Sequence, residues 1–485
     1  MERQSRPFAS IRSSAIDGIA QNPYYKLAQL KKLHQALVEN AARIQNVMSE
    51  DAGSTPVSVK VEFCLALRCV ADAHASIEPK KVLADEYALA HGVDSPEARE
   101  PVGIVVIEPS SHSFTHSLLA ALAPALAAGN CAIVQYENSL RRTPGVVLEI
   151  IGRALDSDIF TFTSKPATDA DIGHRHIRVI QNGTLETCPS HHLVSAPMTP
   201  VVAFVERDAD IDAAAKAIAI ARFSQGGNSP YAPDVVLVNE WIKPQFLTAV
   251  VQQHVHISSK DTSPSKPTRG TRSNVATESE KEGSNIISLG QNGTIIDVGD
   301  RQSILARPKV TQASLRILAV KSMDDAIEIS NQIGPLAAAY AFCTPAMAKY
   351  FCQFTKSELH FANQLPTKLL YGPMAPNGNP PCDASLTLYT QNMFTVPRPQ
   401  FIVSAKNNER IDAFHFGRDS VQDLDKFAAE ATAQLPDPKR PGKAVPLGFF
   451  EQGIVTGLAL TLSALIGGSG LIGYSVLWYW RTQRS

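Results

Sequence analysis

The uncharged stretch from Gly453 to Trp480 constrains this chain more than any other feature of its sequence. A helix needs about 20 apolar residues to cross the hydrocarbon core of a bilayer, and this stretch is longer. A buried core helix is the alternative, but such helices rarely stay uncharged over this length. Trp478, Tyr479 and Trp480 close the stretch, as expected for aromatic rings at a membrane interface, and Arg481 follows. The sequence predicts one transmembrane helix over 453–480.

The segments on either side of this helix indicate how the protein sits on the membrane. Few residues follow the span, and the N-terminal residues contain no apolar run typical of a secretory signal. We therefore expect a cytosolic body anchored by its C-terminus, with the endoplasmic reticulum as the expected membrane. Four prolines between Gln434 and Pro446 favour an extended chain, and we expect a linker over 404–452.

The composition is that of a folded body with no bias toward polyanions. Hydrophobic residues make up 44% and charged residues 19%, which excludes a fully disordered chain. The net charge is −1, and no basic stripe with interleaved aromatics occurs, so nucleic acid is not an expected partner. The seven cysteines form no CxxC pair, which gives no support to a zinc or redox site.

Helical and strand patterns alternate along the body. Apolar residues recur at helical spacing after Asn22-Pro23 and again over 57–77. Strands are then predicted at 102–107, 131–134, 201–205, 235–238, 315–320 and 337–343. Helices are predicted between them at 118–128, 143–155, 211–223 and 324–332. This order predicts parallel sheets covered by helices, and the polar segment 258–285 reads as a disordered insertion.

Several stretches of the body are similar to a known family. They are 26–77, 100–130, 208–238 and 323–363, together with the ending Tyr389–Phe401. In this order they resemble the aldehyde dehydrogenase superfamily, most closely its class 3, fatty-aldehyde-like branch, and the ending resembles fungal members. The likeness covers most of residues 20–403. Members of that branch can also carry a C-terminal membrane helix.

The resemblance implies an α/β aldehyde dehydrogenase-like fold. A Rossmann-like NAD(P) domain would cover 1–198, a catalytic-type α/β domain 199–384 and an oligomerisation strand region 385–403. NAD or NADP would be the cofactor, an apolar aldehyde the substrate, and a homodimer or a heterodimer with another aldehyde dehydrogenase the assembly. In the family reaction a cysteine thiolate attacks the aldehyde, hydride passes to nicotinamide, and a glutamate activates water. An asparagine side chain and a backbone N–H stabilise the oxyanion.

The motif that carries the family's nucleophile is altered here. It normally reads Gly-Gln-Thr-Cys-x-Ala-Pro-Asp, and residues 227–234 read Gly-Asn-Ser-Pro-Tyr-Ala-Pro-Asp. Pro230 therefore stands where the cysteine belongs. Proline has neither a nucleophile nor an N–H, so both the attacking group and the backbone oxyanion donor are lost. The flanking cysteines along the chain are Cys188 and Cys343, too far in sequence for a shifted alignment to restore the thiolate.

The other positions that the resemblance assigns to chemistry are also changed. Ala196 stands at the water-activating glutamate, and His112 at or near the oxyanion asparagine. Gln135 replaces the lysine on the adenosine ribose, with Asn138 nearby, and Gln312 aligns with the glutamate on the nicotinamide ribose. The phosphate-binding Thr-Gly-Ser turn has no clear counterpart, and the chain between 160 and 184 looks shortened.

Two other groups of residues could supply chemistry. Ser229 precedes the old nucleophile position, and His112 would approach the same pocket as its base if the family fold is kept. The alternative is that Ser229 is a loop residue and His112 a polar turn residue. His174, His176, His191 and His192 resemble a metal cluster, but without a carboxylate pair we read them as solvated loop histidines and expect no metal.

Three hypotheses follow from these observations. The first is a membrane-anchored aldehyde dehydrogenase homologue with little or no activity, a pseudoenzyme that acts as a scaffold or as the partner of an active subunit. The second is a working enzyme on apolar aldehyde or acyl substrates with an altered mechanism. The third is a pseudogene product or a faulty gene model around 160–184.

Overall fold

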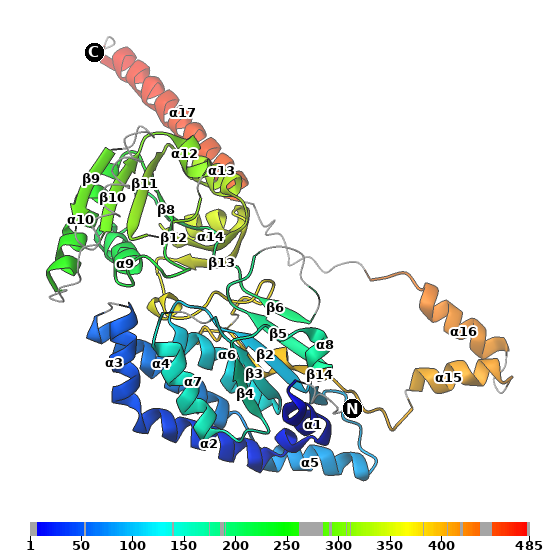
Figure 1. Cartoon of the computed structure of the whole chain (residues 1–485). Helices are drawn as coiled ribbons and strands as arrows, with labels where there is room; N and C mark the ends of the chain where they lie inside the picture. The colour runs from blue at the N-terminus through cyan, green and yellow to red at the C-terminus, as the bar shows by residue number, and fades with distance from the viewer. Residues whose placement is uncertain are drawn as a thin grey trace. The chain divides into compact units, whose positions relative to one another are not determined.

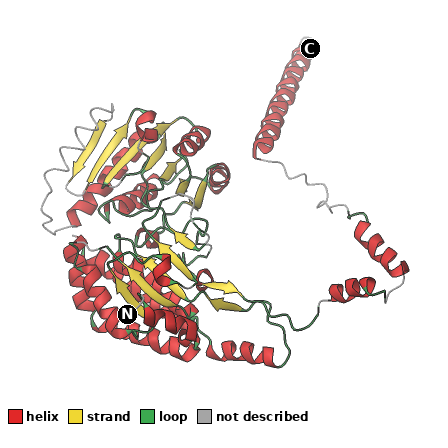
Figure 2. Cartoon of the chain, turned by 45° about the vertical axis from the view of Figure 1, so that its right-hand side comes forward, coloured by secondary structure: helices red, strands yellow, loops and turns green. Residues whose placement is uncertain are grey.

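The computed structural model divides into two units, residues 1–403 and residues 404–485. It describes residues 7–52, 55–137, 140–173, 175–184, 189, 191–260, 285–290, 293–306, 308–310, 312–381, 383–404, 406–417, 421–436 and 449–482. Figure 1 labels the elements along the chain, and Figure 2 separates helices from strands by colour.

Helices form the N-terminal part of the first unit. They are α1 (Ala9–Asp17), η1 (Ile19–Gln21), α2 (Pro23–Glu39), α3 (Ala41–Ala52), α4 (Pro56–Ala75) and α5 (Pro79–Ala90). The α2 start follows from its sequence, because the Asn22 side chain accepts the N–H groups of Tyr24 and Tyr25 and proline occupies the first position. Leu30, Leu33 and Leu37 bury the inner face of α2.

A five-stranded parallel sheet follows, in the order β4-β3-β2-β5-β6. Its strands are β2 (Ile104–Glu108), β3 (Cys131–Gln135), β4 (Phe160–Thr163), β5 (His176–Ile180) and β6 (His192–Val194). The crossovers carry α6 (Phe114–Ala128), α7 (Thr143–Ala154) and α8 (Asp169–Ile172). The apolar helix α6 is almost wholly buried and packs on α4, β2 and β3. Helix α8 is short, with four residues.

A seven-stranded sheet has the order β13-β12-β7-β8-β11-β10-β9, and only its edge strand β9 runs antiparallel. Its strands are β7 (Val201–Val205), β8 (Val235–Asn239), β9 (Asn285–Gly290), β10 (Gly293–Val298), β11 (Ser314–Val320), β12 (Leu336–Phe342) and β13 (Ser357–Ala362). Its helices are α9 (Ile211–Phe223), α10 (Lys243–Lys260), α12 (Arg301–Ala306), α13 (Met323–Ile333) and α14 (Pro345–Phe354).

The chain then returns to the first half of the unit. It passes through η2 (Thr367–Leu370) and η3 (Gln391–Phe394) into β14 (Thr395–Pro397), which pairs with β1 (Arg99–Pro101) in an antiparallel two-stranded sheet. The Asn130 side chain donates to Phe394 O at 3.0 Å and accepts from Gly103 N at 2.8 Å. These buried bonds fasten the end of the unit to the five-stranded sheet.

The second unit corrects one expectation. The segment expected as a linker, 404–452, contains α15 (Lys406–His415) and α16 (Val421–Thr432). Phe414 and Phe427 face each other with ring centroids 5.7 Å apart, and Arg410 pairs with Glu430. An apolar contact and an ion pair join these two helices. The expectation of a linker rested on the prolines that follow them in the sequence and did not consider these contacts. Most of the proline-rich part lies outside the described residues.

The C-terminal helix α17 spans Phe449–Thr482. Within it, Gln452–Ser475 is long and apolar enough to cross a membrane, with a mean hydropathy of 1.7 over its most apolar window and no part of that window buried. Its bounds overlap the span expected over 453–480. The expected insertion 258–285 lies mostly outside the described residues, although α10 continues to Lys260 and β9 begins at Asn285.

Candidate functional site

A cavity of about 520 Å³ opens at the carboxyl edge of the five-stranded sheet. The ends of β2, β3 and β5 supply Glu108, Gln135 and Ile180 to its wall, and the start of α7 supplies Thr143. Ligands of parallel α/β sheets bind in a crevice at this edge, because the crossovers leave the strand ends open there. The position and size of the cavity therefore suit a nucleotide.

The charge of this cavity is mostly negative. Among the described residues of its wall, Asp51, Glu62, Glu108 and Glu137 stand beside one guanidinium, that of Arg141. Arg141 donates to Ser111 O at 2.6 Å, and Asp51 accepts the N–H groups of Arg142 and Thr143 at the start of α7. Carboxylates outnumber cations, so the cavity suits an anionic pyrophosphate poorly.

Glu62 is the unusual acid of this group. Burial raises the pKa of its carboxyl to about 7, and the backbone N–H groups of His116 and Thr115 limit the shift by bonding to the charged form. These amides belong to the first turn of α6, where the helix dipole favours a negative charge. The Glu62 carboxyl thus accepts hydrogen bonds from backbone N–H groups that could otherwise bind an anionic ligand.

The residues expected on the adenosine side of the cofactor are differently placed. Gln135 lies at the end of β3, and its Oε1 accepts from Ala167 N at 2.9 Å, so the amide holds the β4–β5 crossover. Asn138 lies outside the described residues. Neither residue supplies the positive charge of the family lysine.

A glycine–threonine pair that the sequence reasoning passed over follows β5. Gly183 donates its N–H to Ser195 O at 2.9 Å, and an added Cβ would lie 2.2 Å from Val194 Cγ1. Only glycine allows this close approach of the turn to β6. Thr184 follows, and residues 181–191 join β5 to β6 with no helix among the described residues. The order of strands could have indicated this turn in advance, because Gly183 follows β5 directly. Its neighbour Asn182 lies in the cavity wall.

His112 lies in the turn between β2 and α6. Its Nε2 bonds to Leu370 O at 2.9 Å, and burial lowers the pKa of its ring. His116 bonds to Tyr371 O at 3.1 Å, and burial lowers its pKa to about 4. Both rings are therefore neutral at pH 7 and hold the segment around η2.

The loop from Phe223 to Asp234 carries the altered nucleophile motif. Pro230 is buried there, and its carbonyl accepts from Lys309 Nζ at 2.8 Å. Ser229 is 2% exposed, and its Oγ has no hydrogen-bond partner in the described part of the chain. The described residues show no hydrogen bond between Ser229 and His112.

Three buried charged residues fix this loop. Asp234 lies 3.6 Å from Arg222 and 3.1 Å from Lys309, and its carboxylate also accepts from Val201 N and Val310 N. Burial lowers the pKa of Lys309, and the neighbouring Asp234 opposes that shift. Sequence reasoning read Asp234 only as part of a motif, because nothing along the chain relates it to Arg222 or Lys309.

Gln312 lies directly against the same loop. Gly227 has φ +79°, and an added Cβ would lie 2.4 Å from the Gln312 carbonyl group. The structure thus brings together the loop and the residue expected beside the nicotinamide ribose. Ala196 is buried beyond the end of β6, and no carboxylate occurs between His192 and Pro200.

A second cavity of about 350 Å³ lies between α4, α6 and the segment before η3. Its wall includes Pro124, Leu369, Leu388 and the ring of Tyr389. The Tyr389 hydroxyl lies 3.4 Å from Ser195 Oγ. The mainly apolar wall suits a small apolar ligand.

Comparison with known sequences identifies relatives of this chain. Residues 14–181 match the aldehyde dehydrogenase family. Aldehyde dehydrogenase family 3 member B1 of Mus musculus is 22% identical over 365 residues, which cover 68% of this chain and 76% of the relative. Family 3 member A2 of the same species is 22% identical over 381 residues, covering 70% and 75%.

Comparison with solved structures gives the same fold. Staphylococcus aureus AldH, in a substrate-bound state, has a TM-score of 0.65 at 18% identity and covers 84% of this chain and 98% of its own. GapN of Methanocaldococcus jannaschii, complexed with NADP, has a TM-score of 0.60 at 14% identity over 81% and 92%. The chain therefore contains an aldehyde dehydrogenase family domain with the aldehyde dehydrogenase fold, and is similar to class 3 members at low identity.

Proposed function

We propose that this protein is a membrane-anchored pseudoenzyme of its family, a scaffold or the partner of an active aldehyde dehydrogenase subunit. The observation that carries this proposal is Pro230, which is buried at the position expected for the nucleophile. The loop around it is held by Lys309 and Asp234. A thiohemiacetal cannot form on proline, and no shift of this loop brings a cysteine into its place. The family reaction would have to begin on another residue.

The cofactor cavity supports the same proposal. NAD and NADP carry an anionic pyrophosphate, and NADP an additional phosphate, whereas four acids and one arginine line the cavity. The residues present do not fit the group well, and we assign them no step with it. We expect dinucleotide binding to be weak or absent.

Activity and binding assays on the purified full-length protein in detergent test the proposal. We expect no NAD- or NADP-dependent turnover of long-chain aldehydes and no dinucleotide binding by calorimetry at micromolar concentration. Turnover that Ser229→Ala or His112→Ala abolishes would overturn it. Co-purification with a tagged class 3 subunit in the same membranes tests the partner role, with an unrelated tail-anchored protein as control.

Helix α17 is the proposed anchor, with the body on the cytosolic side of the endoplasmic reticulum. Leu462 and Leu465 lie near the middle of the candidate span. A charged residue at the centre of a membrane helix costs about 3 kcal/mol on insertion scales. We expect Leu462→Arg with Leu465→Arg to move the protein into the soluble fraction, and the matched double alanine variant to stay in membranes. Retention of the arginine variant would exclude this anchor.

A working enzyme with an altered mechanism is the second candidate. The unpartnered Ser229 hydroxyl and the apolar cavity beside Tyr389 favour it. The lack of a hydrogen bond between Ser229 and His112 among the described residues weighs against it. Covalent labelling of Ser229 by an apolar fluorophosphonate, seen by mass spectrometry and lost in His112→Ala, would favour this candidate.

A further inference from the structure

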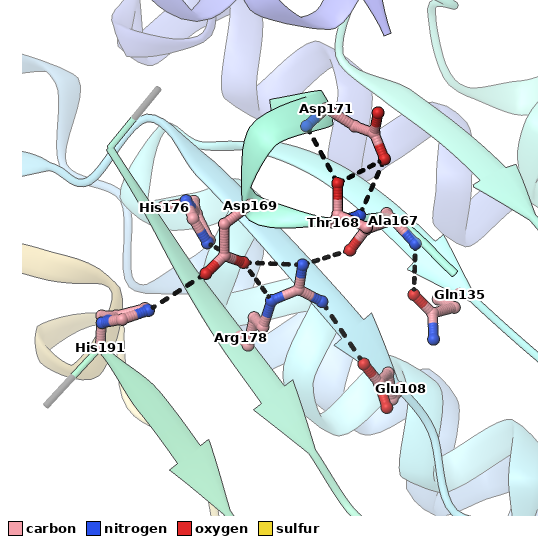
Figure 3. Close-up of polar contacts among 9 residues, drawn as sticks. All are labelled: Glu108, Gln135, Ala167, Thr168, Asp169, Asp171, His176, Arg178 and His191. Atoms are coloured by element: carbon pink, nitrogen blue, oxygen red, sulfur yellow. Dashed lines mark hydrogen bonds and ion pairs between the residues drawn. The ribbon is translucent and has the colours of Figure 1, made fainter. Parts of the chain in front are cut away.

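Two histidines and an aspartate meet on the five-stranded sheet, away from the altered loop. The candidate ligand atoms of Asp169, His176 and His191 all lie within 4.8 Å of one another. Figure 3 shows both imidazole rings directed at the Asp169 carboxylate. The sequence reasoning found no carboxylate among these histidines, because Asp169 is brought to them only by the crossover between β4 and β5.

Regular structure positions each of the three groups. Asp169 opens α8, whose start is fixed by a capping box between Thr168 and Asp171. His176 is the first residue of β5, and His191 directly precedes β6. The Arg178 N–H donates to His191 O at 3.0 Å, which sets the position of the two strands. The groups therefore belong to three elements whose backbones are already paired or capped.

The spacing of these atoms is close to that of a metal site. His176 Nε2 lies 3.1 Å from Asp169 Oδ1, and His191 Nε2 lies 4.0 Å from Asp169 Oδ2. Ligands bound tetrahedrally at about 2.0–2.2 Å stand roughly 3.3–3.5 Å apart. Small side-chain rotations would bring the three donors to one ion. Asp169 is 59% and His191 41% exposed, so a cation can reach them.

Arg178 accounts for one oxygen of Asp169 and leaves the other available. Its Nε donates to Oδ1 at 2.9 Å, and its Nη1 lies 3.6 Å from Glu108. An ion pair with Arg178 is therefore the alternative role of Asp169. That role explains neither His191 facing Oδ2 nor the convergence of two imidazoles. Arg178, which bonds to Oδ1, would orient the carboxylate, as groups behind metal ligands commonly do.

A further imidazole lies beside the cluster. The His192 ring centroid is 4.5 Å from that of His191, and His192 Nε2 is buried with no hydrogen-bond partner in the described part of the chain. An unsatisfied buried nitrogen costs free energy unless a ligand or water satisfies it. His192 therefore adds a further imidazole beside the cluster, outside the group of three ligand atoms, and water or a ligand would satisfy its nitrogen.

We propose that Asp169, His176 and His191 bind one divalent late transition cation, of which Zn²⁺ is the best match. Two imidazoles and a carboxylate suit Zn²⁺, Co²⁺, Ni²⁺ or Cu²⁺ rather than Mg²⁺ or Ca²⁺, which prefer oxygen ligands alone. The ion would join the β4–β5 crossover to the start of β6. It would stabilise a connection that runs from β5 to β6 without a helix among its described residues.

Metal titration of the tag-free full-length protein in detergent tests the site. Chelator-treated protein should bind one equivalent of Zn²⁺ by calorimetry, and Co²⁺ should give the strong visible absorption of a tetrahedral site. His176→Ala and Asp169→Asn should each weaken Zn²⁺ binding at least about 100-fold, more than loss of an outer contact does. Mg²⁺ should not compete.

Controls separate this site from other histidines and from misfolding. His34→Ala removes a histidine of α2 and should leave the stoichiometry unchanged. Zn²⁺ should raise the melting temperature of the wild type but not of Asp169→Asn, because an ion that binds only the folded state stabilises it. Equal Zn²⁺ binding by wild type and by folded His176→Ala would overturn the proposal, as would the absence of saturable binding.

Discussion

The loop Phe223–Asp234 and the cavity at the carboxyl edge of the five-stranded sheet differ in the interactions that determine their structure. The loop is held by buried groups that do not depend on the side chain at position 230. Lys309 binds the Pro230 carbonyl, and Asp234 binds two cations. The cavity is lined instead by charged groups at the ends of strands and helices.

This difference indicates that the loop and the cavity should respond differently to substitution. A loop whose path is set by backbone carbonyls and buried ion pairs depends little on the side chain at position 230. A binding cavity instead depends on the net charge of its wall, which single substitutions change. Substitutions among the buried charges that hold the loop, Arg222, Asp234 and Lys309, should therefore change stability. Substitutions in the cavity wall should change ligand binding.

The largest effect on stability is expected at Asp234. Asp234→Ala would leave Arg222 and Lys309 buried without their anion and would free two backbone N–H groups. Loss of one partner from a buried ion pair costs about 3–5 kcal/mol. We expect the free energy of unfolding of the full-length protein, measured by urea titration in detergent, to fall by that amount.

An exposed ion pair provides the matched control for Asp234. Asp72 lies 2.8 Å from Arg68 on the surface of α4, with both side chains more than half exposed. Asp72→Ala should cost about 0.5 kcal/mol or less, since solvent screens such pairs. Similar losses in Asp234→Ala and Asp72→Ala would contradict the idea that buried charges hold the loop.

A smaller effect on stability is expected at Glu62. Its pKa is raised to about 7 in the folded state from a model-compound value of 4.5, so the folded protein binds more protons than the unfolded chain between these values. The stabilising contribution of the protonated carboxyl is complete below pH 4.5 and is lost as pH rises through 7. Glu62→Gln should remove this loss and be about 1–3 kcal/mol more stable than wild type at pH 8.

Thermal melts between pH 5 and pH 8 measure the Glu62 effect. The wild type should lose stability over this range relative to Glu62→Gln. Glu149→Gln is a suitable control, because Glu149 of α7 pairs with two exposed arginines, Arg43 of α3 and Arg153 of α7. A difference between wild type and Glu62→Gln that does not change with pH would disprove the raised pKa.

Much of the fold followed from the sequence. Hydrophobic runs and turn residues located the central strands, because those strands are buried on both faces and contain few polar residues. β7 and α9 have the bounds expected for them, and Asn22-Pro23 starts α2. The short strands β5 and β6 were missed, since their histidines and arginine read as loop residues. α15 and α16 were missed because their contacts are few and local.

The site was less predictable because its important contacts join residues far apart in the chain. The sequence indicated that Pro230, Ala196 and His112 stand at altered positions. It could not indicate that His112 binds Leu370 O, or that Asp169 meets His176 and His191. Those contacts depend on which crossover covers which strand. The spacing of apolar residues along the sequence does not reveal that arrangement.

The smallest effect is expected from restoring one positive charge to the cavity. Gln135→Lys places a cation where the family uses lysine, among carboxylates that now outnumber the single arginine. A partly exposed charge is worth about 1 kcal/mol, which corresponds to roughly fivefold in affinity for an anionic ligand. NADH fluorescence titration to millimolar concentration measures the change. Gln135→Met, which also loses the bond to Ala167 N, is the matched control. If lysine and methionine give equal affinities, the charge of the wall does not limit binding, and the connection from β5 to β6, which has no helix among its described residues, becomes the better explanation.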